Sequence, residues 1–235
     1  MRRLFLSTTL ITLIALPTHA AEPDAPVVPP KKGKSEKIEL FDGKTLEGWE
    51  GHKELWSVKD GAIVGKNTKE VKVSTYLLTK NKYTDFHLAL SAKLVQSEMH
   101  SGVAIWGAVA PEKGDPFTYK GHLVMFPSGW GLWDLYGRAG GLKADNKPAL
   151  KINKQHDWNE MEIYGQGNRI RLVANGVLVL DWRDPEPDTI KEGPIGLQLH
   201  SNPQPQEMQF KGLVLTTFPD DAKLEGKKVG DKVGP

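Results

Sequence analysis

One short segment of the chain concentrates side chains that can bind and polarise a sugar. At even spacing it carries Trp130, Asp134, Tyr136 and Arg138, and alternate residues of a β-strand point to the same face of its sheet. A carboxylate and a guanidinium can bind sugar hydroxyls, while aromatic rings stack on pyranose C–H groups. The alternative is structural: Asp134 and Arg138 form an ion pair at a strand end, and Trp130 fills a loop.

Three histidines add groups that could move a proton. His100, His122 and His200 lie in or beside segments with a strand pattern, and Gln198 shares a strand face with His200. Imidazole titrates near neutral pH, so each ring could act as a general acid or base. The alternative for each of them is an ordinary hydrogen-bonded histidine.

Metal or two-carboxylate chemistry has less support in the sequence. Imidazole and carboxylate suit several divalent ions, but no compact ligand motif such as His-Glu-x-x-His is present. We therefore assign no metal ligand and no required cofactor, and keep a divalent metal as an alternative. An ordinary glycosidase needs two carboxylates at a fixed separation. Glu160 and Glu162 alternate with apolar residues, which predicts a solvated strand face instead.

Strand patterns dominate the elements that would position these residues. Apolar and other residues alternate from Phe86 to Leu94 and from Ile195 to Leu199, as in strands with one buried face. Asn175-Gly176 separates two apolar runs and supplies the positive φ of a type I′ turn, which predicts a hairpin. Further strands are predicted at Trp56–Val58, Ala62–Gly65, Tyr76–Thr79, Val103–Trp106, His122–Phe126, Leu132–Tyr136, Glu160–Tyr164 and Met208–Thr217.

The pattern as a whole predicts an all-β fold. Many short strands are separated by Gly, Asn, Asp and Pro turns, and no run of crossover helices is available for a parallel α/β sheet. We expect a two-sheet antiparallel jelly-roll sandwich with one concave sheet that forms a groove. Alternate residues of its strands would then line a single sugar site.

The two ends of the chain are predicted to lie outside the folded body. Residues 1–20 have the basic start, apolar stretch and small terminal residues of a secretory signal peptide. Residues 21–37 are predicted to be a Pro/Lys-rich extended linker, 38–218 the β-sandwich domain, and 219–235 a flexible Lys/Gly-rich tail. We expect an exported protein, periplasmic or extracellular, with no membrane insertion after signal cleavage.

The amino-acid composition indicates which classes of binding partner to expect. The 235 residues include 31 basic and 29 acidic ones, for a net charge of +2, and no cysteine. Proteins that bind nucleic acid need a concentrated basic patch, and outside its terminal segments this chain has none in its sequence. We therefore expect no nucleic-acid partner. Without disulfides, the fold of an exported protein must be held by its core.

Several short motifs occur in a characteristic order and resemble the 3-keto-disaccharide hydrolase family over nearly the whole body. They are Phe41-Asp42-Gly43-Lys44-Thr45-Leu46-Glu47-Gly48-Trp49, Trp56-Ser57-Val58-Lys59-Asp60-Gly61, Leu77-Leu78-Thr79, Tyr83-Thr84-Asp85-Phe86, Ser101-Gly102-Val103, Trp158-Asn159, Asn175-Gly176 and Gly196-Leu197-Gln198-Leu199-His200. The resemblance implies a concanavalin A-like lectin/glucanase fold, export from a bacterium, and cleavage of an oligosaccharide or glycoside substrate whose C3 hydroxyl has been oxidised to a ketone. Many members carry Asn-Ser-Gly where this chain has His100-Ser101-Gly102. Many also carry Tyr followed by an acidic residue and Gln where this chain reads Tyr119-Lys120-Gly121-His122-Leu123.

A ketone at C3 makes a one-base mechanism available. It acidifies the C2 proton, so abstraction gives an enolate that expels the C1 substituent, and water then adds to the enone. We expect His122 or His100 to be the base, Arg138 and Tyr136 to donate to the enolate oxygen, and Asp134 to orient them or hold a metal. The residues expected to bind the sugar are Trp106, Trp130, Gln198 and His200.

Two other classes of protein fit the same sequence. A non-catalytic carbohydrate-binding module would keep the aromatic groove but need no base, and the two departures from the family pattern favour it. An envelope interaction protein would use the Lys-rich ends as tethers. Only the composition of the sequence supports this class.

Overall fold

The computed structural model describes residues 25–96, 99–126, 133–136, 142–143, 151–189 and 192–220. The signal peptide predicted at 1–20 and most of the tail predicted at 219–235 lie outside these residues. Among the described residues, no helix has the length and apolarity that crossing a lipid bilayer requires. A short 3-10 helical turn, η1, spans Pro187–Thr189.

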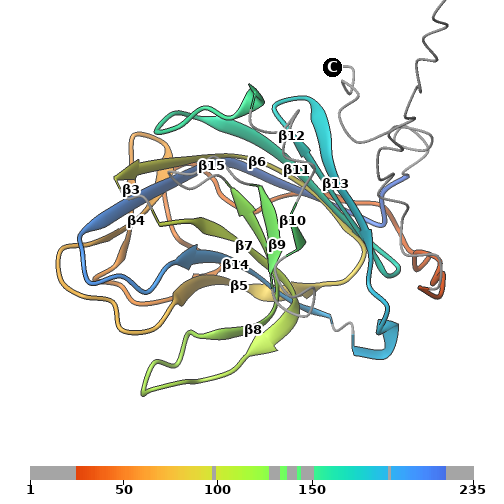
Figure 1. Cartoon of the computed structure of the whole chain (residues 1–235), viewed down its shortest axis with the longest axis horizontal. Coiled ribbons are helices and arrows are strands. Elements are labelled where there is room, and N and C mark those ends of the chain that lie inside the picture. The colour runs from red at the N-terminus through yellow and green to blue at the C-terminus, as the bar shows by residue number, and fades with distance from the viewer. Residues whose placement is uncertain are drawn as a thin grey trace, which may run out of the picture.

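The fold is all-β, as predicted, and its strands form two antiparallel sheets that lie on one another (Figure 1). Sheet A has the order β13-β12-β11-β6-β15-β4-β3, with β1 paired to β15. In chain order its strands are β1 Lys37–Glu39, β3 Trp56–Lys59, β4 Ala62–Asn67, β6 Phe86–Gln96, β11 Asn159–Gln166, β12 Arg169–Ala174, β13 Val177–Arg183 and β15 Gln206–Thr217.

Sheet B has the order β10-β9-β8-β7-β14-β5-β2. Its strands are β2 Trp49–Glu50, β5 Thr75–Tyr83, β7 Ser101–Val109, β8 Tyr119–Phe126, β9 Asp134–Tyr136, β10 Leu142–Lys143 and β14 Gly193–Leu199. All eight further strands predicted from the sequence have a counterpart, whereas the short strands β1, β2 and β10 were not predicted.

The core lies between the sheets and follows the period-two pattern. In β6, Leu88 and Leu90 point into it and are at most 3% exposed. Val103 of β7 and Leu197 of β14 meet them from sheet B. Each buried leucine or valine contributes about 1.5–3 kcal/mol relative to an exposed side chain. The predicted hairpin is confirmed: Asn175 and Gly176 both have positive φ, 47° and 77°, between β12 and β13.

The opposite face of sheet B, here called its outer face because it points away from sheet A, is also partly apolar. Tyr76, Leu78, Ala104, Leu123 and Met125 form a separate buried cluster there. Phe117, in the segment that joins β7 to β8, and Tyr119, at the start of β8, pack against this cluster. A sheet that is apolar on both faces gives less clear alternation in the sequence than one with a solvated face.

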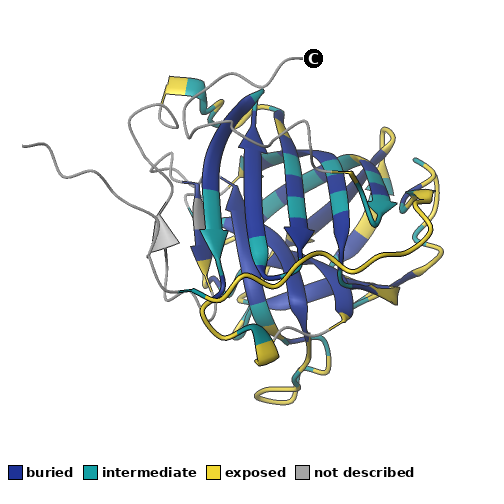
Figure 2. Cartoon of the chain, turned by 90° about the vertical axis from the view of Figure 1, so that its right-hand side faces the viewer, coloured by how far each residue is buried: buried dark blue, intermediate teal, exposed yellow. Residues whose placement is uncertain are grey.

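Residues 25–36, predicted to be an extended tether, are extended but bound to the sandwich; we call them the strap. In Figure 2 the strap is the long exposed segment, in yellow, that crosses the strands. The side chain of Asn168, fully buried, accepts from the amide of Val28 at 3.0 Å and donates to the carbonyl of Pro26 at 2.6 Å. Asp85 accepts from the amide of Lys31 at 3.0 Å. The strap is therefore held by hydrogen bonds to buried side chains.

We predict that Asn168→Ala lowers the free energy of unfolding by about 2–4 kcal/mol, because it removes the side-chain partner of the buried carbonyl of Asp184 and of two partly buried backbone groups of the strap. The amide of Asn168 also donates to the carbonyl of Asp184 at 2.9 Å. Urea unfolding measures the change. A chain that begins at Lys34 provides the control: the substitution should cost less there, because the strap contacts are already gone. An equal cost in both backgrounds would contradict the role of the strap.

Candidate functional site on the outer face of sheet B

Three side chains that the sequence singled out come together at one end of the outer face. His100 immediately precedes β7 and His200 immediately follows β14, and these two strands are paired. The two imidazole rings lie edge to face with centroids 4.4 Å apart. The ring of Tyr136, from β9, lies nearly parallel to His100 at 5.9 Å. Strands distant in sequence thus bring two imidazoles and an exposed phenol together.

Gln198 extends this group along β14. It lies on the same face as His200, and its amide nitrogen donates to the hydroxyl of Tyr76 at 3.1 Å. Its carbonyl oxygen is buried and has no hydrogen-bond partner among the described residues. Turning the amide over would satisfy the oxygen but leave the amide nitrogen without a partner. An unpaired buried polar atom costs about 1–3 kcal/mol.

Burial sets the charge of the site. Burial first, and the neighbouring His200 second, lower the pKa of His100 from its ordinary 6.5 to about 4. Burial also lowers the pKa of His200, against a smaller opposing effect of its hydrogen bond to Ser201. Burial raises the pKa of Tyr76, so its hydroxyl stays protonated and can donate. At neutral pH the site therefore offers two neutral imidazoles, which can accept protons, beside a phenol.

Two neutral imidazoles side by side could also contribute ligands to a divalent metal, because neutral imidazole is a metal ligand. A third ligand is not found in the described part of the chain, which holds no group of three His, Cys, Asp or Glu suited to a metal. Asp134 belongs to β9, but its side chain is outside what the structure describes.

The structure corrects the expected position of His122. Its ring is 0% exposed and lies on the core side of β8, with Nε2 3.0 Å from a carboxylate oxygen of Asp184. The aromatic ring of Trp182 contacts it edge to face at 5.2 Å. Leu123 and Met125 take the outer face, so alternation directs His122 inward. Of the two histidines considered as the base, His100 is the one at this face.

Trp106 is also in the core, 1% exposed, and not at the sugar face where it was expected. The register between β7 and β8 shifts between Ile105 and Ala108, and Trp106 has a φ of 52° within this bulge. Its indole donates to the carbonyl of Thr84 at 2.5 Å. A bulge of this kind re-aims a side chain, which the sequence pattern does not reveal.

The remaining predicted residues belong to the segment around β9. Trp130 and Arg138 lie outside the described residues, and for Asp134 the structure gives only the strand. Of the four residues predicted to share one strand face in this segment, Tyr136 is the one whose side chain the structure describes, and it is 42% exposed. Tyr76 is the residue that sequence reasoning missed. Its strand was predicted, but its contact with Gln198 depends on pairing between segments 122 residues apart.

The class of protein follows from this fold and face: an all-β jelly-roll sandwich of the galectin and glucanase type. The chain resembles a provisionally assigned glycosyl hydrolase from Parabacteroides distasonis, with 22% identity and a TM-score of 0.57 over 78% of this chain and 100% of the other. It also resembles a Bacillus licheniformis β-glucanase, with 12% identity and a TM-score of 0.54 over 80% and 100% of the chains. A third relative is the carbohydrate-binding module CBM66 from Bacillus subtilis, with 13% identity and a TM-score of 0.50 over 71% and 93%.

The chain belongs to the family described as the 3-keto-alpha-glucoside-1,2-lyase-like domain, whose model matches residues 36–216. This membership confirms the resemblance seen in the sequence motifs. A search of curated protein sequences returned no match. Family and fold together indicate a carbohydrate-related function.

The depressed pKa of His100 predicts a pH-dependent stability. Because the folded pKa is about 4 and the ordinary value is 6.5, protons bind the unfolded chain first as the pH falls. Stability from this group is complete above pH 6.5 and is lost between about pH 6.5 and 4, by roughly 1–2 kcal/mol after allowance for partial exposure.

Urea unfolding at several pH values checks this prediction when the protein is compared with its His100→Gln variant. The variant should lose less stability across that range, because glutamine does not titrate. Ring-proton NMR gives the pKa of His100 directly. A value near 6.5, or identical pH profiles for the two proteins, would contradict the prediction.

Proposed function

We propose that this protein is an exported enzyme that cleaves glycosides oxidised to a ketone at C3. The observation that carries the proposal is the meeting of neutral His100 and His200 with Tyr136 on the outer face of sheet B. Membership of the 3-keto-alpha-glucoside-1,2-lyase-like family supports this substrate class. The signal-like sequence of residues 1–20 supports export.

In the proposed reaction, neutral His100 takes the C2 proton of the sugar. The electrons of the C2–H bond form an enolate with the C3 carbonyl, and the hydroxyl of Tyr136 donates to the enolate oxygen. When the carbonyl re-forms, the C1–C2 double bond forms and the C1–O bond breaks. The leaving oxygen takes the proton from the His100 imidazolium. Water then adds across the double bond, so the net reaction is hydrolysis.

The low pKa of His100 favours the second half of this cycle, in which the protonated ring gives its proton to the leaving oxygen. An imidazole with a pKa of about 4 is a weak base, so it requires an acidic C–H group, which a neighbouring ketone supplies. An enolate that forms beside the ring raises the pKa of that ring, because opposite charges attract. Once protonated, the imidazolium is a strong acid and can readily protonate the leaving oxygen.

The other polar groups of the face are assigned to binding and positioning. Gln198 is assigned to positioning, because its side-chain amide holds the hydroxyl of Tyr76. The hydroxyl of Tyr76, held by the amide of Gln198, can donate to a sugar oxygen. His200 contacts the ring of His100 edge to face and positions it.

A non-catalytic carbohydrate-binding module is the second candidate. It is favoured by the low pKa of His100, which limits its strength as a base, and by the likeness to a carbohydrate-binding module. Such a module would bind a saccharide at the same face without turnover.

We predict that His100→Gln lowers kcat/KM about 10²–10⁴-fold on 3-keto-glucosides, the usual contribution of a general base. Tyr136→Phe should lower it less. Release of 4-nitrophenol from 3-keto-glucosides of both anomeric forms measures the rate, and the unoxidised glucosides should not react. Proton abstraction predicts exchange of the C2 hydrogen in D₂O, which NMR detects and which His100→Gln should abolish.

The matched control is His87→Gln. His87 is half-buried like His100 but lies on the outer face of sheet A, stacked on Tyr164 and paired with Glu162. Its substitution should leave kcat/KM unchanged. Full activity of the His100→Gln variant would exclude His100 as the base. Binding of the 3-keto-glucoside without turnover by the unaltered protein would establish the binding module instead.

A further inference from the structure

The segment that joins β7 to β8, residues 110–118, contains an aspartate to which the proposed cleavage assigns no role. We call this segment the hairpin loop. Residues 111–114 of the loop are exposed, whereas the side chain of Asp115 is 15% exposed. Beside the loop lies a cavity of about 660 Å³, lined by residues around 52–57, 66–75 and 113–115. Close packing is therefore lacking on this side of the loop, and the contacts of Asp115 must hold it there.

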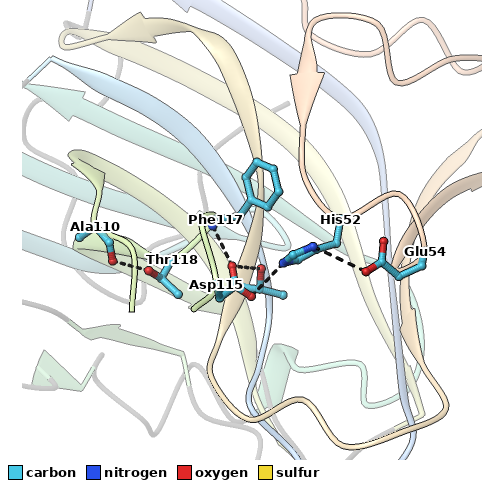
Figure 3. Close-up of polar contacts among 7 residues, drawn as sticks. His52, Glu54, Ala110, Asp115, Phe117 and Thr118 are labelled. Carbon is cyan, nitrogen blue, oxygen red and sulfur yellow. Dashed lines mark hydrogen bonds and ion pairs between the residues drawn. The ribbon is translucent and has the colours of Figure 1, made fainter. Parts of the chain in front are cut away.

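The carboxylate of Asp115 is bonded to three separate parts of the chain. One oxygen accepts from the backbone amide of Phe117 at 2.7 Å and from the hydroxyl of Thr75, in β5, at 3.2 Å. The other lies 3.0 Å from Nε2 of His52, and because a carboxylate only accepts, that nitrogen donates. The carbonyl of His52 accepts from the amide of Trp56, the first residue of β3, at 3.2 Å. Figure 3 shows Asp115 linked to both His52 and the amide of Phe117.

These contacts converge on the position of Tyr76. Thr75, whose hydroxyl Asp115 accepts from, is the residue before Tyr76 in β5. The carbonyl of Phe117 accepts from the amide of Tyr76 at 3.0 Å. The ring of Phe117 also packs against the apolar cluster that contains Tyr76. One carboxylate therefore fixes both the residue before Tyr76 and the backbone acceptor of Tyr76 itself.

The hairpin loop takes the place of a neighbouring strand at this point of sheet B. On the side of β5 away from β14, strand β2 pairs with Leu78 and Thr79. At Tyr76 the hydrogen-bond partner is instead the loop, through Phe117. The edge of the sheet at Tyr76 therefore depends on the loop, and through it on Asp115.

Tyr76 in turn belongs to the candidate sugar site. Its hydroxyl accepts from the side-chain amide of Gln198 at 3.1 Å, on the face that also carries His200. A phenol that accepts one hydrogen bond keeps its own hydrogen, so the hydroxyl can still donate to a sugar oxygen. A hydrogen bond weakens steeply as its angle departs from linear. A small movement of β5 would therefore reduce this contact.

We propose that Asp115 is a positioning residue of the sugar site: it holds the hairpin loop against β5 and so orients the hydroxyl of Tyr76. The inference rests on the proposed function, in which Tyr76 binds a sugar oxygen and His100 takes the proton. Tyr76 is not assigned to a reacting atom, so its contact contributes equally to the ground state and the transition state. Loss of Asp115 should therefore raise KM and leave kcat nearly unchanged.

Cleavage of a 3-keto-glucoside by the full chain tests the proposal. The Asp115→Ala variant should raise KM about tenfold, equivalent to about 1.4 kcal/mol, and change kcat less than about twofold. Asp115→Asn keeps an oxygen that can accept from Phe117 and Thr75, so it should restore most of the affinity. In a Tyr76→Phe background, Asp115→Ala should raise KM no further, because the hydroxyl that it orients is absent. Additive effects of the two substitutions, or a fall in kcat at unchanged KM, would overturn the proposal.

The matched control is Asp42→Ala. Asp42 also accepts from two backbone amides and a hydroxyl, those of Lys44 and Thr45, at 2.8, 2.8 and 3.2 Å, but in the turn before β2. Its substitution removes a similar set of hydrogen bonds and should leave KM unchanged. Urea unfolding establishes that both alanine variants are folded under the assay conditions. An equal rise of KM in the two variants would show a general loss of stability and contradict the assigned role.

Amide hydrogen exchange separates this inference from the proposed function. The amide of Tyr76 should exchange at least about tenfold faster in Asp115→Ala, relative to the core amides of β6, because its acceptor is released. In Asp42→Ala its exchange should be unaltered. If the unaltered protein cleaves no 3-keto-glucoside, the proposed function fails, and the exchange rate still decides whether Asp115 positions Tyr76. Unchanged exchange in Asp115→Ala would overturn the inference whatever the activity.

Discussion

The pairing of β14 with β5 on one side and β7 on the other is the constraint on which the candidate site depends. It places Gly196 between Ala104 and Leu78, and Leu197 between Val103 and Leu77. Gln198 then meets Tyr76, and His200 meets His100. The alternate residues Leu197 and Leu199 are fully buried in the core. A slip of one residue would exchange the two sets, so core packing fixes which side chains form the site.

Much of this arrangement could be predicted from local patterns. The alternation from Ile195 to Leu199 assigns one face to the core and the other to Gln198 and His200, and the structure agrees. The Asn175-Gly176 turn requires only the conformations of its own two residues, and both have the expected positive φ. Signals of this kind need no knowledge of distant partners, because the residues that carry them are neighbours in the chain.

The predicted positions of His122 and Trp106 were wrong because tertiary structure, and not the local sequence pattern, decides which way these side chains point. In β8 both faces are apolar, since Leu123 and Met125 belong to the cluster on the outer face while Val124 is in the core. A polar residue such as His122 was therefore assigned to the wrong side. In β7 a bulge turns Trp106 inward. The cavity lined by residues around 52–57, 66–75 and 113–115 could not be predicted for another reason: its walls come from three segments that only the fold brings together.

The buried position of His122 gives it a structural role that complements the site. Its partner Asp184 is 1% exposed and is hydrogen-bonded twice to Asn168: the backbone amide of Asp184 donates to the carbonyl of Asn168, and the side-chain amide of Asn168 donates to the carbonyl of Asp184. Asn168 in turn holds the strap. A chain without cysteine cannot fix a terminal segment with a disulfide. Here a histidine–aspartate pair and one asparagine connect the core to the strap, and because such a buried network is costly if one member is lost, it specifies a single position for that segment. Burial thus gives different roles to the two histidines that the sequence offers as bases. His122 stabilises the fold, whereas His100, half-buried beside Tyr136, remains available for chemistry.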